Sequence, residues 1–337
     1  MKKKRLLLLF VGLALTLSVM AQAPANYYNS ANGLTGDRLK AALHNIVKGH
    51  TSISYAQIWN AFWSTDNKGN GVVWDMYSDR PNGTPPYTYQ LGQNQCGNYD
   101  SEGDCYNREH SWAQSWFGND NTAKTDLHHI FATDGFVNQK RSNYPFGEVL
   151  SASWTSKNGS KLGSCKTPGY SGTVFEPIDA YKGDFARAIM YMSVRYYGED
   201  ASWSSSDMTT KSVIKPWAVD MLLRWNELDP VSQKEIDRNN AIYNDYQHNR
   251  NPFVDHPEYA RMIWDPHWSA DEYVLPNDIQ ADCIIVYDIS GRMLLKKSIM
   301  NEEEEMVSLK NQLQRGCYLI QLLGGNRVLS SKKLLVY

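Results

Sequence analysis

Residues 107–143 hold most of the side chains of this sequence that could carry out chemistry. The segment contains NREHSWAQSWFG from Asn107 and DLHHIFATDGFVNQKRSN from Asp126, so histidines, carboxylates and amides are gathered in one short stretch. Carboxylate and amide oxygens are hard ligands that suit Mg²⁺ or Ca²⁺, and a neutral imidazole beside them can accept a proton. The composition of this segment indicates metal-assisted acid–base chemistry.

Each of these residues also has an ordinary structural explanation when it is taken alone. The adjacent Glu109 and His110 are usually a surface pair, and Asn138 is usually an exposed helix amide. His128 and His129 could belong to a packed strand with one satisfied core histidine. The evidence for a site therefore lies in the ordered combination and not in any single member.

Two kinds of element must position these side chains. In an extended segment Glu109 and His110 point to opposite faces, so that one can face a metal and the other a water. A helix is predicted directly after Thr133, which can act as its N-cap. On that helix Asn138 and Arg141 are three residues apart and share one face.

The surrounding chain is predicted to be mainly helical up to about residue 265. Apolar residues recur at helical spacing in several stretches, and Pro230 occupies a first-turn position in one of them. Residues 66–103 and 155–170 are rich in turn-forming residues and are predicted to be loops, with a short strand at 72–76. The predicted helices are 36–50, 54–65, 182–197, 213–228, 230–246 and 259–264.

The two ends of the chain differ from this central part. Residues 1–21 have a basic start, an apolar run and a small-residue cleavage site at Met20-Ala21, as in a secretory signal peptide, with a retained anchor as the alternative. No other apolar stretch is long enough to cross a membrane. After about Trp268 the sequence changes to short β-prone runs separated by turns. We therefore divide the chain into residues 1–21, 22–268 and 269–337.

Charge and cysteine content restrict the function further. Removal of residues 1–21 takes away four basic and no acidic side chains, so the net charge changes from −2 to −6. This excludes a globally basic protein that coats nucleic acid, and any phosphate binding must be local. Of the five cysteines, Cys96 and Cys105 are the expected disulfide pair, while Cys165 could instead pair with either.

The ordered motifs resemble the endonuclease I family of secreted and periplasmic nucleases, which contain a ββα-metal (His-Me finger) motif. The matching pieces are NREHS at 107–111, DLHH at 126–129 and VNxxRSNxPFG at 137–147. Supporting pieces begin at Cys96, Phe175, Lys182 and Asn249, and the resemblance covers roughly residues 34–264. It implies an α+β fold, in which a mainly helical nuclease domain with long loops contains the ββα-metal motif.

The resemblance also implies roles for individual residues. Glu109 and Asn138 would hold one divalent metal, Mg²⁺ in the first place, with Ca²⁺ or Mn²⁺ as alternatives. His110 would be the general base that activates a water, and the product would carry a 5′ phosphate. Three supporting residues are implied, namely Asp126, His128 and His129. A cation near the phosphate is expected, and the candidates are Arg141 and Arg187.

The C-terminal region resembles the sorting domain of type IX secretion. The residues that carry this resemblance are YDISGRML at 287–294, GCYLIQ at 316–321 and SKKLLVY at 331–337. The resemblance implies a small Ig-like β-sandwich and export through the periplasm by that secretion machinery, to the medium or the cell surface. A carbohydrate-binding or purely structural β-module is the alternative.

The combined prediction is a secreted, metal-dependent endonuclease that acts on the backbone of DNA, RNA or both. Cleavage with little sequence preference needs phosphate contacts and not base readout, which agrees with the absence of a DNA-reading motif. An RNA-preferring extracellular ribonuclease and a non-catalytic surface-binding protein on a nuclease scaffold are the alternatives. A zinc peptidase is disfavoured because the sequence has no HExxH motif.

Overall fold

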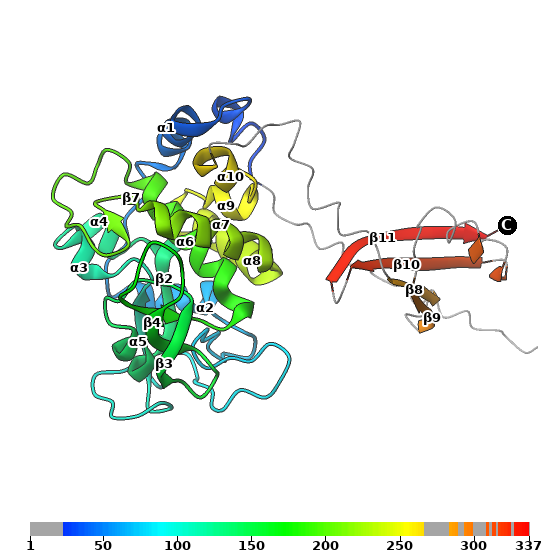
Figure 1. Ribbon diagram of the computed structural model, residues 1–337, viewed down its shortest axis with the longest axis horizontal. Coiled ribbons are helices and arrows are strands. Elements are labelled where there is room, and N and C mark those ends of the chain that lie inside the picture. Colours follow the sequence, from blue (N-terminus) through cyan, green and yellow to red (C-terminus); the bar gives the residue numbers. More distant parts are fainter. Residues whose placement is uncertain are drawn as a thin grey trace, which may run out of the picture. The chain divides into compact units, whose positions relative to one another are not determined.

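The computed structural model describes residues 23–265 and several short segments of the C-terminal region. These segments are 283–288, 293–298, 308–309, 312–314, 316–324 and 327–336. The chain divides into two compact units, residues 1–266 and residues 267–337 (Figure 1). The predicted signal peptide lies outside the described residues. Within the described parts of the chain, no helix is both long and apolar enough to span a bilayer.

The first unit combines many helices with small antiparallel sheets, which confirms the mixture of helices and strands that was predicted. The α-helices are α1 (Gly36–Val47), α2 (Ile58–Thr65), α3 (Gln114–Phe117), α4 (Asn121–Lys124), α5 (Gly135–Arg141), α6 (Lys182–Arg195), α7 (Pro216–Leu228), α8 (Gln233–Ala241), α9 (Pro252–Asp255) and α10 (Tyr259–Trp264). The strands are β1 (Tyr106–His110), β2 (Ile130–Asp134), β3 (Val149–Thr155), β4 (Lys161–Cys165), β5 (Thr173–Glu176), β6 (Thr209–Thr210) and β7 (Val213–Ile214). They form the sheets β1-β2, β3-β4-β5 and β6-β7.

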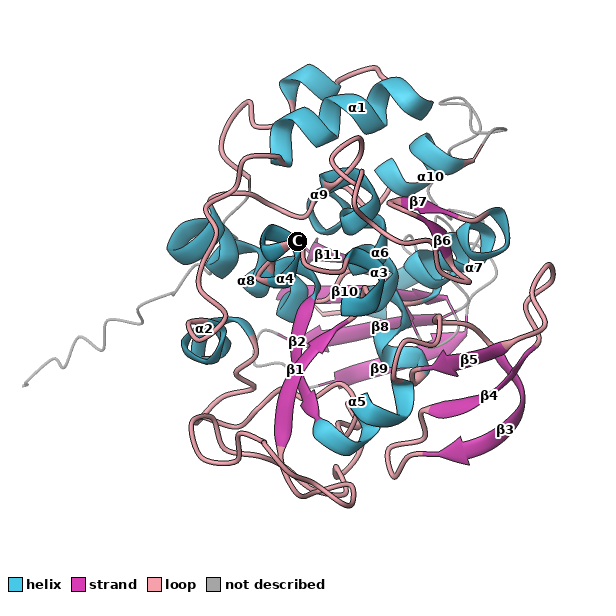
Figure 2. Ribbon diagram, turned by 90° about the vertical axis from the view of Figure 1, so that its left-hand side faces the viewer, coloured by secondary structure: helices cyan, strands magenta, loops and turns pink. Residues whose placement is uncertain are grey.

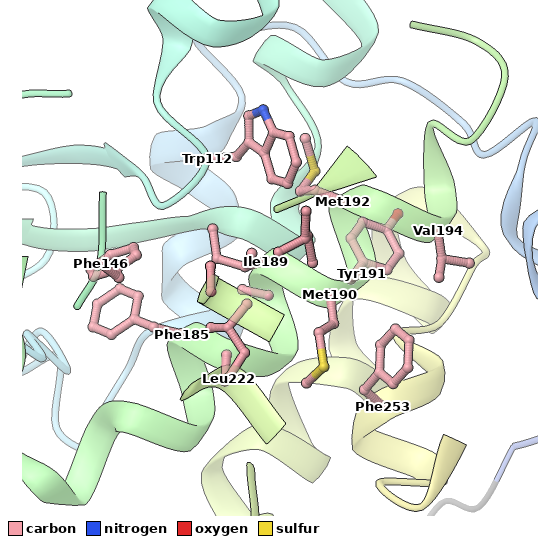
Figure 3. Close-up of a cluster of buried hydrophobic side chains, with 14 of the residues drawn as sticks. Trp112, Phe146, Phe185, Ile189, Met190, Tyr191, Met192, Val194, Leu222 and Phe253 are labelled. Atoms are coloured by element: carbon pink, nitrogen blue, oxygen red, sulfur yellow. The ribbon is translucent and has the colours of Figure 1, made fainter. Parts of the chain in front are cut away.

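Helix α6 is the centre of the hydrophobic core of this unit. All 14 of its residues are buried, and it packs against α1, α7 and α9. Figure 3 shows Phe185, Ile189 and Met192 of α6 among aromatic and aliphatic side chains from other elements, including Trp112 and Phe146. A helix whose residues are buried on every side, charged ones such as Arg187 included, is enclosed by other elements. Helix α6 therefore provides the rigid base on which the rest of the unit packs.

Two of the predicted elements differ in extent from the elements that the structure contains. The helix predicted to start at Pro230 begins at Gln233, because Ser232 and Glu235 form a capping box. The Oε2 atom of Glu235 accepts a hydrogen bond from the backbone N–H of Ser232 at 2.9 Å. The predicted strand at 72–76 is reduced to single bridges that involve Val72 and Val73. Both predictions were therefore wrong in their details.

Residues 155–170 were predicted to be a loop. This prediction was wrong in part, because they contain β4. This strand pairs with β3 on one side and with β5 on the other. Gly163 permits the pairing, since a Cβ atom at this position would lie 2.1 Å from the backbone oxygen of Ser151. The glycine that suggested a loop in the sequence allows two strands to approach closely.

The second unit contains one antiparallel sheet among its described residues, in the order β11-β10-β8-β9. The strands are β8 (Cys283–Asp288), β9 (Met293–Ser298), β10 (Gly316–Gly324) and β11 (Arg327–Val336). Alternate residues of β8 and β10 are buried in one cluster with Leu309, as in a sheet with one covered face. The predicted β-module is thus present in part, while a two-sheet Ig-like sandwich remains a prediction.

Candidate active site

A β-hairpin followed by a helix carries the candidate catalytic residues. Strands β1 and β2 are antiparallel, with Glu109 opposite Phe131, and α5 follows β2 directly (Figure 2). The N-cap of α5 is Asp134, whose carboxylate accepts a hydrogen bond from the backbone N–H of Val137 at 2.7 Å. The prediction that Thr133 caps this helix was wrong, because the Asp134 side chain binds the first turn while the Thr133 hydroxyl is buried without a hydrogen-bond partner among the described residues.

A disulfide fixes the segment that leads into β1. Cys96 and Cys105 form the expected pair, and Cys165, the alternative partner, is a free buried cysteine. Within the closed loop, the backbone N–H of Gly103 donates to the carboxylate of Asp134 at 2.9 Å. The loop is therefore attached to the N-terminus of α5.

An open cleft of about 400 Å³ lies over the end of β1 and the exposed side of α5. It brings together four of the predicted site residues, namely Glu109, His110, Asn138 and Arg141. The other lining residues are Tyr55, Arg108, Ala113, Gln114, Ser115, Ser142 and Asn143. The hairpin and the helix thus place a carboxylate, an imidazole and an amide around one space.

The Glu109 carboxylate is buried, with only 1% of its surface exposed, and lines this cleft. Its Oε1 atom accepts a hydrogen bond from the Tyr77 hydroxyl at 2.9 Å and lies 3.3 Å from a guanidinium nitrogen of Arg141. Burial raises the pKa of the Glu109 carboxyl to about 7, although Arg141 and Tyr77 lower it. A cation in the cleft would add to the positive charge of Arg141 and would further favour the ionised form of this buried carboxylate.

The side chain of Asn138 is held by a second asparagine. Its Nδ2 atom donates to the Oδ1 atom of Asn107 at 2.7 Å, which leaves the Asn138 Oδ1 atom available. Asn107 precedes Glu109 by two residues in β1 and therefore lies on the same face of the strand. Glu109 and Asn138 present one carboxylate and one amide oxygen, a donor set that fits Mg²⁺.

A metal bound here would take most of its ligands from outside the protein. Across the described residues, no group of three or more His, Cys, Asp or Glu side chains is arranged to hold a metal ion. Mg²⁺ commonly keeps several waters and binds through one or two carboxylates together with substrate phosphate. Two protein oxygens in an open cleft agree with that mode of binding.

The imidazole of His110 is held in one orientation and one protonation state. Its Nε2 atom lies 3.1 Å from the backbone carbonyl oxygen of Lys124. Because a carbonyl oxygen can only accept, Nε2 carries the proton and Nδ1 carries the free lone pair. Burial and the neighbouring His129 lower the pKa of the His110 imidazole to about 3. The ring is therefore neutral near pH 7.

The three predicted supporting residues are buried and do not line the cleft. Burial lowers the pKa of the His128 and His129 imidazoles to about 4. The ring centroid of His129 lies 5.4 Å from that of His110, so His129 packs directly against the candidate base. The Asp126 carboxylate accepts hydrogen bonds from Tyr191, Tyr196 and Gln247.

The two candidate arginines have different surroundings. Arg141 lines the cleft, and its guanidinium donates to the backbone oxygen of His110 at 2.8 Å. Arg187 is completely buried and makes two hydrogen bonds to the carboxylate of Glu235, at 2.6 and 2.8 Å. Its remaining nitrogen donates to Asn226 and to the backbone oxygen of Asp229. The proposal that Arg187 contacts phosphate is therefore corrected, since its donors are used inside the core.

The sequence interpretation did not select four residues that the structure places at this site. Asn107 and Arg108 belong to the NREHS motif, but their types gave no reason to prefer them over their neighbours. Tyr55 and Tyr77 come from distant parts of the chain. The guanidinium carbon of Arg108 lies 3.6 Å from the centroid of the Tyr55 ring. In a sequence with 21 tyrosines, no local signal distinguishes these two.

Comparisons with known proteins agree with both resemblances. Residues 35–258 match the family model described as Endonuclease I, and residues 272–337 match the secretion system C-terminal sorting domain. The chain is 42% identical to an extracellular ribonuclease of Bacillus amyloliquefaciens over 246 residues, which are 71% of this chain and 78% of that protein. It is 39% identical to an extracellular ribonuclease of Bacillus subtilis (strain 168) over 249 residues, with the same coverage.

Proposed function

We propose that this chain, which belongs to the endonuclease I family, is a metal-dependent endonuclease that hydrolyses phosphodiester bonds in RNA and in DNA. It is a secreted nuclease that carries a C-terminal sorting domain, and the type IX secretion machinery is its export partner. The observation that carries the proposal is the convergence of Glu109, Asn138 and His110 on one open cleft.

The proposed metal ligands are the Glu109 carboxylate and the Oδ1 atom of Asn138. Mg²⁺ is the first candidate, and Ca²⁺ or Mn²⁺ could take its place. When bound, the metal would neutralise charge on the scissile phosphate and on the leaving oxygen. Tyr77 and Arg141 hold Glu109 in position, and Asn107 binds the Asn138 amide nitrogen, so that the amide oxygen can serve as the ligand.

The proposed general base is the Nδ1 atom of His110. The hydrogen bond from Nε2 to the Lys124 carbonyl keeps the proton on the other nitrogen, so Nδ1 can take a proton from a water. That water attacks phosphorus, and the bond between phosphorus and the 3′ oxygen breaks. The products carry a 5′ phosphate and a 3′ hydroxyl.

This mechanism does not use the 2′ hydroxyl of the substrate. RNA is a substrate by analogy with the two extracellular ribonucleases, and DNA follows because the attacking group is water. Contacts to phosphate carry no sequence information, so little sequence preference is expected.

The test is a degradation assay on plasmid DNA and total RNA, with Mg²⁺ and with EDTA, followed by analysis of the product ends. We expect both substrates to be degraded, EDTA to stop the reaction, every new 5′ end to carry a phosphate and every new 3′ end to carry a hydroxyl. Cyclic 2′,3′-phosphate ends from RNA, or cleavage that persists in EDTA, would show that a different mechanism operates.

A further inference from the structure

A second cavity of about 270 Å³ adjoins the active-site cleft, and the mechanism above makes no use of it. It is formed by residues 52–55 on one side and by Asn121, Thr122, Lys124 and Thr125 on the other. Tyr55 lines both this cavity and the cleft. A strand of substrate that passes over Tyr55 would therefore enter the second cavity as it leaves the first.

The candidate base His110 contacts two residues that line the second cavity, Tyr55 and Lys124. The ring of Tyr55 stacks with the ring of His110 at a centroid distance of 6.1 Å and an interplanar angle of 20°. The backbone oxygen of Lys124 binds His110, while the side chain of Lys124 lines the second cavity. A ligand bound in this cavity would therefore lie near the phosphate on which His110 acts.

Two cationic side chains lie close to the Tyr55 ring. The guanidinium carbon of Arg108 lies 3.6 Å from the ring centroid and Lys124 Nζ lies 4.9 Å from it. Neither cation has a carboxylate within 4.0 Å among the residues that the structure describes. Arg108, which also donates to the backbone oxygen of Tyr55 at 2.9 Å, lines the cleft and Lys124 lines the second cavity, so each space has one positive charge.

The lining of the second cavity suits a nucleoside. It combines hydroxyl and amide groups from Ser52, Ser54, Asn121, Thr122 and Thr125 with the apolar surfaces of Ile53 and Tyr55. Hydroxyls and amides can bind the sugar and the base edges, and flat apolar surfaces can contact the base. The volume is close to the roughly 300 Å³ at the lower end of small-ligand pockets, which is the size expected for a ligand such as one nucleoside.

We propose that this cavity, here called the nucleoside pocket, binds one unpaired nucleoside next to the scissile phosphate. The inference rests on the proposed function, since it needs the phosphate to lie beside His110. A base can enter the pocket only after it leaves its stack and its pairing partner, which is unfavourable in a duplex. The preferred substrate is therefore a single strand.

The experiment compares kcat/KM for three substrates with Mg²⁺ present. These are a single-stranded oligoribonucleotide, its duplex with a complementary strand, and bis(p-nitrophenyl) phosphate, a phosphodiester without any nucleoside. For the wild-type protein we expect the single strand to be cleaved at least about tenfold faster than the duplex. Equal rates on the two forms would overturn the proposal.

Ser52→Trp places a large side chain in the nucleoside pocket. The ratio of kcat/KM for the single strand to that for bis(p-nitrophenyl) phosphate should fall at least about tenfold. The matched control is Ser171→Trp, the same change at an exposed serine that lines neither the pocket nor the cleft, and it should leave this ratio unchanged. An unchanged ratio in Ser52→Trp, or an equal loss on both substrates, would contradict the pocket.

Lys124→Met gives a second, milder test that keeps the backbone carbonyl bound to His110. The KM for the single strand should rise at least about threefold and should depend less on salt, because one phosphate contact is lost. No change in KM or in salt dependence would also contradict the proposal. The proposed function fails independently of both variants if the wild-type protein cleaves none of the three substrates when Mg²⁺ is present.

Discussion

Removal of the Cys96–Cys105 disulfide should loosen the helix that carries Asn138. The closed loop is bound to the start of α5 at two points. The backbone N–H of Gly135 donates to the backbone oxygen of Cys105 at 2.9 Å, and the loop also binds the helix cap Asp134. The double variant Cys96→Ser and Cys105→Ser keeps these hydrogen bonds but opens the loop.

The size of the effect follows from the length of the loop. The two cysteines are separated by nine residues along the chain. For a loop of this length, the chain-entropy relation gives a loss of about 2.5 kcal/mol from the free energy of unfolding. This is a large share of the 5–15 kcal/mol that stabilises a typical domain, and for a unit of this size it lowers Tm by roughly 5–10 °C.

The measurement is urea and thermal unfolding of the wild-type protein and the double variant, followed by kcat at saturating Mg²⁺. We expect the loss of stability together with a lower kcat, because Asn138 is then held less firmly. Cys283→Ser, a change at a free cysteine in the second unit, is the control and should leave both quantities as they are. A loss below about 0.5 kcal/mol with unchanged kcat would mean that hydrogen bonds alone hold the loop.

Three further predictions concern single residues. His110→Ala should lower kcat by about 10²–10⁴-fold while the Kd for Mn²⁺, measured by calorimetry, stays the same; wild-type rates would exclude His110 as the base. Asn107→Ala should raise the Mg²⁺ concentration for half-maximal activity by about 10–100-fold, because Asn138 loses the partner that orients it, and an unaltered metal requirement would contradict this role. Arg187→Met should lower the free energy of unfolding by about 3–5 kcal/mol, since Glu235 stays buried without its partner, and leave KM unchanged; a raised KM at wild-type stability would return Arg187 to the phosphate site.

The parts of the site that could be predicted from the sequence are local. Glu109 and His110 are neighbours in a strand, and Asn138 and Arg141 share a helix face, so alternation and helical spacing were enough to relate them. The disulfide partners are also close along the chain. In each case the relevant distance is set by the geometry of one element or one short loop.

The parts that could not be predicted depend on the packing of distant segments. Arg187 lies in a helix with a clear apolar stripe, and its sequence position does not show where its charge is used. Only the ion pair with Glu235 of α8 shows that the guanidinium is bound in the core. Tyr77 reaches Glu109 from 32 residues earlier. The N-cap of α5 could not be predicted for a different reason. Thr133 and Asp134 can both cap a helix, and only the hydrogen bond from Val137 to Asp134 identifies the residue that does so.

The disulfide also links the state of the enzyme to its location. Cytoplasmic thiols are kept reduced, and disulfides form once a chain reaches an oxidising compartment. Before export the loop is therefore open, and the free energy of unfolding is lower by about 2.5 kcal/mol. The chain reaches its full stability only outside the cytoplasm, so the producing cell contains the less stable form of the nuclease.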